Sequence, residues 1–253
     1  MREEQLRERL LKFERESRYL TKDSDERKVI EEVFDSATLS AINRLLRNGQ
    51  LEDLNGVVST GKEARVYWGV TRDGTPRAVK IYLTASSDFR KRLRYIAGDR
   101  RFESIPGSTR GIVTLWVQKE YKNLQLAEAA GIRVPEPFAF NENVLVMEYI
   151  GEPPGHAPIF AEVQVSQADY RWTLSMVKRL YKRAGLVHGD LSEYNIFKLG
   201  SSRVLFDMGT AVVTTHPEAR ELLLRDVTNL VRFFRRRGIY ERAPEEIVES
   251  IVP

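Results

Sequence analysis

No cysteine occurs in this chain of 253 residues, and that absence excludes several kinds of chemistry. Without a thiol there is no disulfide framework, no Cys-based zinc site and no cysteine nucleophile. The sequence also lacks an apolar run long enough to cross a membrane. Its first residues are charged from Arg2 onward and contain no apolar signal core. We therefore expect a soluble, cytoplasmic protein with no membrane partner.

What the chain does contain is enough apolar material for a large core. Hydrophobic residues make up 42% of the sequence. A chain of this length can form one two-lobed domain or two small domains. The net charge of +4 is modest, so the positions of the arginine clusters carry more information than the total.

The first half of the sequence has mostly the pattern of β-strands. A polar, helical stretch up to about residue 50 finishes with an apolar face and the stop signal Asn48-Gly49. An irregular, Arg-rich stretch covers 84–111, and a helix is expected over 112–130. Strand-like segments are expected around residues 57–58, 64–68, 78–82, 138–140 and 144–147.

The second half has mostly the pattern of α-helices. A Pro- and Gly-rich stretch, 151–158, indicates a linker. Ser166, with Asp169 three residues further on, predicts the start of a helix. A last long helix is expected over 217–237, because its first residue is proline. A hairpin separates these two helices.

The most informative motif lies between the two helices and reads His188-Gly189-Asp190-Leu191-Ser192-Glu193-Tyr194-Asn195. A carboxylate in such a loop can orient a hydroxyl group or accept its proton. An amide oxygen five residues later can reach a metal ion on nucleotide phosphates. We predict Asp190 to be a catalytic base and Asn195 a metal ligand, whereas His188 fits a structural role. The alternative is a solvent turn that contains these residue types.

Asp207 follows the apolar, strand-like run Val204-Leu205-Phe206 and precedes Met208-Gly209. An acid at the end of a strand can point into a cleft and coordinate Mg²⁺. Alone, such a residue is commonly part of a turn, but its pairing with Asp190 and Asn195 favours phosphoryl transfer. We therefore predict Asp207 to be a metal ligand and a member of the catalytic set.

Two charged residues in the first half offer a test of this interpretation. Lys80 lies in Ala78-Val79-Lys80-Ile81, which is close to the strand pattern whose lysine grips nucleotide phosphates in kinases. Glu120 lies inside the apolar stripe of the 112–130 helix. A buried carboxylate needs a partner, and Lys80 is the best candidate. The alternatives are a solvated lysine on a strand and a solvated glutamate beside the stripe.

The segment from Gly56 to Lys62 matches the first part of a P-loop, but Glu63 stands where Ser or Thr should bind the metal. A strand, rather than the required helix, is expected next. Strand–turn–strand is the arrangement of a kinase-type nucleotide loop. The residues predicted to cover the phosphates are Ser59, Thr60, Gly61, Lys62 and Glu63.

The stretch Met147-Glu148-Tyr149-Ile150-Gly151 joins the two halves. In a two-lobed kinase this position is the hinge. The backbones of Glu148 and Ile150 would then bond the adenine edge, and Met147 would line the back of the pocket. A plain strand end is the alternative.

Two basic regions remain, and they indicate contact with RNA, although runs of charge are more often solvated faces. One is Arg90-Lys91-Arg92-Leu93-Arg94 with Arg100-Arg101, which has Phe89, Tyr95 and Phe102 beside it. The other is Arg232 with Arg235-Arg236-Arg237.

Together these residues resemble the RIO family of atypical protein kinases, over about Asp25 to Phe234. The most specific pieces are Ser59 to Ala64, the loop from His188 to Asn195, and Asp207-Met208-Gly209. The one-type branch of the family is the closer fit, because residues 1–50 look like simple helices rather than a winged-helix domain.

The resemblance implies an α+β fold of the two-lobed protein-kinase type, with a β-rich small lobe and an α-rich large lobe. The activation segment is trimmed, since only a short stretch separates Gly209 from Pro217. The expected divisions are a helical extension over 1–50, a small nucleotide-binding lobe over 51–147 and a hinge with the large catalytic lobe over 148–253. The small lobe would include a flexible loop at about 84–111.

The resemblance also implies a function: an ATP- and Mg²⁺-dependent serine/threonine protein kinase or ATPase, with Mn²⁺ as a second candidate metal. It implies autophosphorylation, a phosphorylated aspartate at Asp207 and a role in small ribosomal subunit maturation, with a subunit precursor or its rRNA as partner. The candidate autophosphorylation sites are Ser86, Ser87, Ser104 and Ser108.

Two alternatives stay open. One is a small-molecule kinase of the aminoglycoside or choline type, which also uses a His-Gly-Asp loop. The insertion Ser192-Glu193-Tyr194 and the little room that 151–253 leaves for an acceptor pocket argue against it. The other is a binding protein in which ATP only stabilises a ribosome-assembly scaffold or acts as a slow switch.

Overall fold

The computed structural model describes residues 4–8, 12, 34–84, 92–102, 104–239 and 242–252. The chain divides into two compact units. Unit 1 takes residues 1–91, 104–121 and 136–156, and unit 2 takes residues 92–103, 122–135 and 157–253. Among the described residues, no helix is both long enough and apolar enough to span a membrane.

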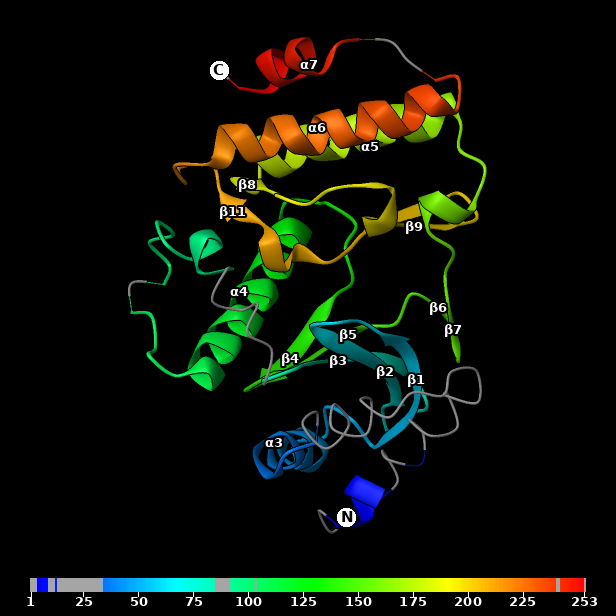
Figure 1. The fold of residues 1–253 in the computed structure, drawn as a ribbon. Helices are drawn as coiled ribbons and strands as arrows, with labels where there is room; N and C mark the ends of the chain where they lie inside the picture. The colour runs from blue at the N-terminus through cyan, green and yellow to red at the C-terminus, as the bar shows by residue number, and fades with distance from the viewer. Residues whose placement is uncertain are drawn as a thin grey trace. The chain divides into compact units, whose positions relative to one another are not determined.

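Unit 1 is built on a five-stranded antiparallel sheet with the strand order β1-β2-β3-β5-β4 (Figure 1). Its strands are β1 (Asp53–Thr60), β2 (Ala64–Val70), β3 (Pro76–Tyr82), β4 (Pro137–Asn141) and β5 (Val144–Glu148). Alternate residues of β2 are buried, as expected for a strand with one face on a core. The five predicted strands are therefore present.

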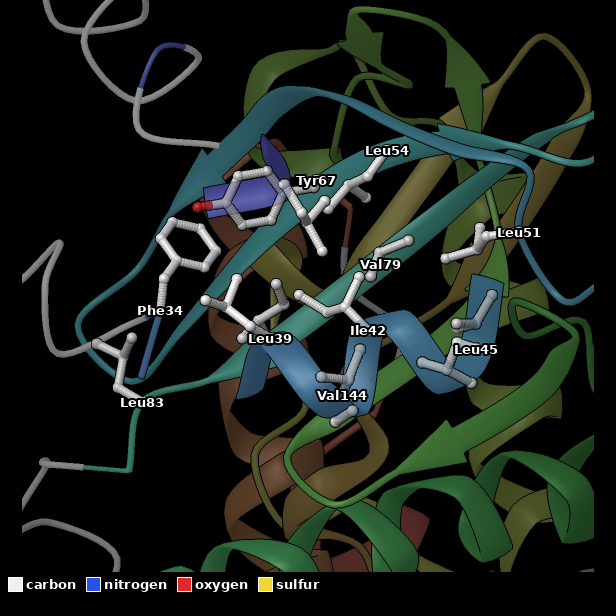
Figure 2. Packing of buried hydrophobic residues seen from close by; sticks show 14 residues of the cluster. Phe34, Leu39, Ile42, Leu45, Leu51, Leu54, Tyr67, Val79, Leu83 and Val144 are labelled. Carbon is white, nitrogen blue, oxygen red and sulfur yellow. The ribbon is translucent and has the colours of Figure 1, made fainter. Parts of the chain in front are cut away.

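Helix α3 (Ser36–Arg47) covers one face of this sheet. Asp35 caps it by accepting a hydrogen bond from the Thr38 backbone N–H at 2.8 Å. Its apolar face packs on strand residues such as Tyr67 and Val79, as Figure 2 shows. The predicted helix before Asn48-Gly49 is confirmed for this stretch; most of residues 1–33 lie outside the described part of the chain.

Helix α4 (Thr109–Ala129) is the long helix predicted over 112–130. It stops at Gly131, whose φ of +74° is unfavourable for residues with a side chain. Its first part belongs to unit 1 and its last part to unit 2. The helix therefore contributes Glu120 to one unit and Asn123 to the other.

Unit 2 consists mainly of helices around short strands. The helices are α5 (Gln167–Lys182), α6 (Ala219–Arg236) and α7 (Pro244–Ile251), with 3₁₀ turns η2 (Phe160–Glu162), η3 (Glu193–Asn195) and η4 (Met208–Thr210). The strand pairs are β8 (Leu186–Val187) with β11 (Val212–Val213), and β9 (Ile196–Leu199) with β10 (Ser202–Leu205). Its core includes a group of aromatic rings in contact: Phe160, Tyr170, Phe233 and Phe234.

The structure corrects three details of the expected elements. Residues 151–158 are more than a linker, because β6 (Gly151–Glu152) and β7 (Gly155–His156) form a small hairpin. Helix α6 begins two residues after Pro217. Helix α7 was not predicted at all; it buries only three apolar side chains, so its periodic pattern is short.

Candidate active site

In unit 1, the predicted partnership between Lys80 and Glu120 is present. Lys80 Nζ lies 2.8 Å from Glu120 Oε1. The side chains are 11% and 1% exposed, so neither solvated alternative holds. The Tyr82 hydroxyl also donates to the Glu120 carboxylate. Because the carboxylate is buried in an apolar stripe, Lys80 supplies the charge that makes its burial tolerable.

The predicted phosphate-covering residues lie where β1 turns into β2, which confirms the strand–turn–strand context. The turn closes with a hydrogen bond from the Gly61 N–H to the Ala64 carbonyl at 3.0 Å. A Cβ at Gly61 would lie 2.9 Å from that same oxygen, so the tight turn requires glycine. Ser59, Thr60 and Lys62 are exposed. Their side-chain donors are therefore accessible to an anion.

The predicted hinge residues lie at and just after the end of β5. Met147 is paired with Ala78 across β3 and β5. The Glu148 N–H is bonded to the Glu136 carbonyl at 2.8 Å, so an adenine contact at this residue would use its own carbonyl oxygen. Ile150 is buried.

In unit 2, helix α6 holds the backbone on both sides of Asp190. The buried Asp226 carboxylate accepts hydrogen bonds from the N–H groups of Gly189, at 2.7 Å, and Leu191, at 2.8 Å. Arg225 donates to the Gly189 carbonyl. Gly189 has φ +77°, and a Cβ there would lie 2.8 Å from the Thr210 carbonyl oxygen. Glycine is thus required at the residue before the predicted base.

Asp226 is a site residue that the sequence interpretation missed. Desolvation by burial raises its pKa to about 6, although His188 and the two N–H groups act in the opposite direction. A signal was available, since Asp226 stands among apolar residues of the α6 stripe just as Glu120 does in α4.

Asp190, the predicted base, has an exposed side chain and a shifted pKa. Its side chain reaches solvent, but desolvation by the surrounding protein still raises its pKa, and the charge of Asp207 raises it further. His188 and Arg225 favour the charged form and act against this shift. A raised pKa makes the carboxylate a better proton acceptor.

Asp207 adopts a left-handed backbone conformation, with φ 62° and ψ 58°. For a residue with a side chain this costs about 1–2 kcal/mol and persists only where neighbours enforce it. Before it, Phe206 donates its N–H to the Asn195 carbonyl at 3.0 Å and is bonded through its own carbonyl to His188 Nε2 at 3.1 Å. After it, the Asn123 amide donates to the carbonyls of Met208 and Ala211. His188 thus has the structural role predicted for it.

The donor set suits a nucleotide-bound Mg²⁺. Asp207 and Asn195 offer a carboxylate and an amide oxygen, and Ser192 Oγ positions the amide by donating to Asn195 Oδ1 at 2.9 Å. Within the described residues, no three His, Cys, Asp or Glu side chains cluster as metal ligands. Mg²⁺ commonly takes one or two protein oxygens and completes its shell with phosphate and water.

The predicted residues therefore fall into two sets in different units. Lys80 and Glu120 are joined in unit 1, which also holds the turn at 59–63 and the residues after β5. Asp190, Asn195 and Asp207 belong to unit 2. The loops of Asn195 and Asp207 are linked by the backbone bond from Phe206 to Asn195. The negative charge of Asp207 also acts on Asp190 and raises its pKa.

Comparison with solved structures supports the fold. The Rio2 kinase from *Chaetomium thermophilum*, in a complex with ADP, Mg²⁺ and phosphoaspartate, matches with a TM-score of 0.68 at 22% identity. The match covers 85% of this chain and 66% of that one. A second structure of that kinase matches with a TM-score of 0.66 at 23% identity. The predicted two-lobed, kinase-like α+β fold class is confirmed.

Sequence comparison gives the family. The model of the RIO domain matches residues 65–247. The RIO-type serine/threonine-protein kinase Rio1 of *Haloferax volcanii* is 45% identical over 225 residues, which cover 88% of this chain and 77% of that protein. Human serine/threonine-protein kinase RIO1 is 36% identical over 92% of this chain, which corresponds to 42% of the human protein. This chain belongs to the RIO family of serine/threonine protein kinases.

Proposed function

We propose that the chain is an ATP- and Mg²⁺-dependent kinase or ATPase that transfers the γ-phosphoryl group through the two sets of residues described above. The observation that carries this proposal is the buried Lys80–Glu120 pair at 2.8 Å. A buried ion pair is a poor source of stability, whereas a lysine held in this way on a strand is what a kinase needs to grip the nucleotide phosphates.

Each residue then has a role in that reaction. Lys80 binds the α- and β-phosphates while Glu120 keeps its ammonium group in place. The turn at 59–63 covers the phosphates, and the backbones of Glu148 and Ile150 bind adenine beside Met147. Together these groups position the nucleotide, which is the larger part of catalysis in phosphoryl transfer.

The acidic loops of unit 2 act on the acceptor hydroxyl and on the metal ion. Asp190 accepts the proton of the attacking serine or threonine hydroxyl, and its raised pKa suits that task. Asn195 and Asp207 hold Mg²⁺, or Mn²⁺ in its place, which neutralises charge on the phosphates. The γ-phosphoryl group passes from ATP to the acceptor oxygen and ADP leaves, while the hydroxyl proton passes to Asp190.

ATPase turnover through Asp207 is a second route for the same site. A carboxylate oxygen of Asp207 would attack the γ-phosphorus and release ADP, and water would then hydrolyse the acyl phosphate. The phosphoaspartate named in the *Chaetomium* Rio2 complex favours this route. The short connection from η4 to α6 also favours it, because few residues remain there for docking a peptide.

We further propose that the protein acts in the cytoplasm on precursors of the small ribosomal subunit, with the precursor or its rRNA as partner. This proposal rests on family membership. Exposed cations at the end of α6, such as Arg232 and Arg236, are available for RNA.

The assay that tests the proposal measures autophosphorylation and single-turnover ATP hydrolysis, with and without small-subunit precursors. Asp190→Ala should abolish autophosphorylation without unfolding the protein. A normal rate in that variant would remove Asp190 as the base. Stimulation of hydrolysis by precursors would favour the switch. Its absence, together with strong phosphorylation of a free protein, would favour the kinase.

A further inference from the structure

Residues 92–102, here called the brace, form part of the Arg-rich stretch between β3 and α4. Both flanking elements start in unit 1, but the brace itself packs in unit 2. Its aromatic residues Tyr95 and Phe102 are 8% and 6% exposed. These two rings are therefore unavailable to stack on RNA bases, whereas Phe89, the third aromatic residue of this basic region, lies outside the described residues.

One end of the brace is tied to the turn that follows Asp207. Arg101 forms a two-pronged ion pair with the buried Asp99, with Nη2 at 2.6 Å from Oδ2 and Nε at 2.9 Å from Oδ1. Arg101 Nη2 also donates to Asn123 Oδ1 at 2.9 Å. The Asn123 amide, which is fully buried, donates in turn to the carbonyls of Met208 and Ala211, both at 2.9 Å.

The other end of the brace is tied to the loop that carries Asp190. Arg94 donates to the Tyr95 hydroxyl at 2.8 Å, and that hydroxyl is also hydrogen-bonded to Arg225. Arg225 in turn donates to the Gly189 carbonyl. A single side chain on α6 therefore connects the brace to the residue before the predicted base.

A third contact fixes the middle of the brace. The buried His216 ring bonds through Nε2 to the carbonyls of Arg94, at 3.0 Å, and Ala97, at 2.8 Å. Its Nδ1 accepts the Glu218 N–H at 3.1 Å. Close packing supports these bonds, because a Cβ on Gly98 would lie 3.1 Å from Pro217 Cδ.

We propose that the brace is a built-in positioning device for both acidic loops: Arg101 acts through Asn123 on the turn after Asp207, and Tyr95 acts through Arg225 on the backbone before Asp190. The part of this proposal that concerns metal and nucleotide rests on the proposed function; the part that concerns loop order does not.

The backbone of Asp207 explains why a device of this kind is needed. Bonds from Phe206 to His188 and to the Asn195 carbonyl fix the backbone before this left-handed residue. After it, the Asn123 amide donates to the carbonyls of Met208 and Ala211. Removing the Asn123 amide takes a side-chain hydrogen bond from two carbonyls at once, although the Met208 carbonyl still accepts the Ala211 N–H at 3.2 Å. The carboxylate of Asp207 would then sample more than one direction.

The test uses the full chain and the variant Asn123→Ala, with Thr173→Ala as control. Thr173 is a buried polar residue of the same unit that donates one hydrogen bond to the Asp169 carbonyl at 2.8 Å. Amide hydrogen exchange of the ligand-free proteins is the first readout. Exchange at 207–213 should rise about tenfold in Asn123→Ala and stay within about twofold of wild type in Thr173→Ala.

The second readout is the affinity for ADP with and without Mg²⁺. Asn123→Ala should weaken binding in the presence of Mg²⁺ about tenfold and change metal-free binding less than about twofold. The proposal is overturned if Asn123→Ala weakens ADP binding equally with and without Mg²⁺, or if exchange at 207–213 is the same in Asn123→Ala and Thr173→Ala. Either result would mean that Asn123 contributes only to packing. If Mg²⁺ does not raise the affinity of the wild-type protein for ADP, the proposed function fails. The exchange measurement still decides whether the brace orders the two acidic loops.

Two milder variants keep the test decisive if Asn123→Ala does not fold. Arg101→Lys retains a cation for Asp99 but loses the two-pronged geometry, and it should speed exchange at 207–213 in the same direction. Tyr95→Phe keeps the buried ring and removes the hydroxyl, so it should speed exchange at 189–191 and leave 207–213 unchanged. Folded variants with wild-type exchange in these segments would contradict the proposal.

Discussion

Glu120 in unit 1 and Asp169 in unit 2 are both buried carboxylates with cationic partners, but their surroundings differ. Asp169 accepts hydrogen bonds from Lys198 and Arg203 at 3.0 and 2.6 Å. It also accepts from the N–H and hydroxyl of Ser166, which caps α5. Among the described residues, Glu120 accepts hydrogen bonds from Lys80 Nζ and from the Tyr82 hydroxyl.

The difference indicates what each cluster is for. Asp169 joins the start of α5 to the β9–β10 hairpin, two parts that no backbone ladder connects, so its charges hold the fold together. Lys80 and Tyr82 lie in the middle of a sheet that is already closed by strand pairing. The strand pairing of the sheet forms through the backbone and does not depend on the contact with Glu120. We therefore expect the first cluster to control stability and the second to control activity.

Removing the Asp169 cluster should have the largest effect on stability. Asp169→Ala leaves Lys198 and Arg203 without their partner and deletes a helix cap, and we expect a loss of about 3–5 kcal/mol in the free energy of unfolding. Urea denaturation followed by circular dichroism measures it. Phosphoryl transfer per folded molecule should change less than about threefold. A larger loss of activity in the folded fraction would end the proposed separation of the two clusters.

Removing the Lys80 cation should have the next largest effect, and on activity. Lys80→Met keeps most of the side-chain volume but deletes the charge, so we expect phosphoryl transfer to fall by about 10²–10³-fold. Autophosphorylation rates at saturating ATP and Mg²⁺ measure it. Glu120 is left buried without a cation in this variant. Lys80→Met with Glu120→Gln is the matched control: it should recover stability and remain inactive, whereas recovered activity would contradict the assignment.

Unit 2 alone offers a second contrast, between Asp169 and Asp226, which respond to pH in opposite ways. Burial by itself would raise the pKa of Asp169, but hydrogen bonds from Lys198, Arg203 and Ser166 outweigh it and hold the pKa at about 2. Its stabilisation is therefore present above pH 4 and is lost as the pH falls from about 4 to 2. Asp226, with its pKa raised to about 6, binds its proton more tightly in the folded state.

The contribution of Asp226 is consequently greatest at low pH and declines as the pH rises from about 4 to 6, by roughly 3 kcal/mol for a shift of this size. Unfolding free energies of wild type and Asp226→Asn between pH 4 and 7 measure it. The unfolding free energy of wild type should fall relative to that of Asp226→Asn as the pH rises through that window. A pH-independent difference would show that Asp226 does not titrate there.

The sequence allowed the Lys80–Glu120 pair to be predicted because a charged residue interrupts an apolar helical stripe, and such an interruption requires a partner. Asp226 interrupts the α6 stripe in the same way, so the same argument could have found it. The strand–turn–strand context of Gly61 was also predictable, since a local change from period 3.6 to period 2 marks it.

Other parts of the site could not be read from local pattern. Asn123 contacts carbonyls 85 and 88 residues further along the chain, and an asparagine on a helix carries no periodic sign of such a partner. The brace looked irregular because Asp99, Arg101 and Gly98 serve contacts in unit 2 rather than a helix or strand of their own. The β6–β7 hairpin has only two residues in each strand, too few for alternation to be visible.

A third carboxylate, Glu142, shows how little an exposed ion pair should contribute to stability compared with the buried clusters of Asp169 and Glu120. Glu142 pairs with Arg44 and lies 3.5 Å from Arg110, but its side chain is 31% exposed and that of Arg44 is 50% exposed. Water already solvates both groups, so Arg44→Ala should cost only about 0.2–1 kcal/mol, and less at high salt. Urea denaturation at low and high salt measures this loss, and autophosphorylation should be unchanged. A loss as large as that of Asp169→Ala would mean that burial is not what separates these clusters.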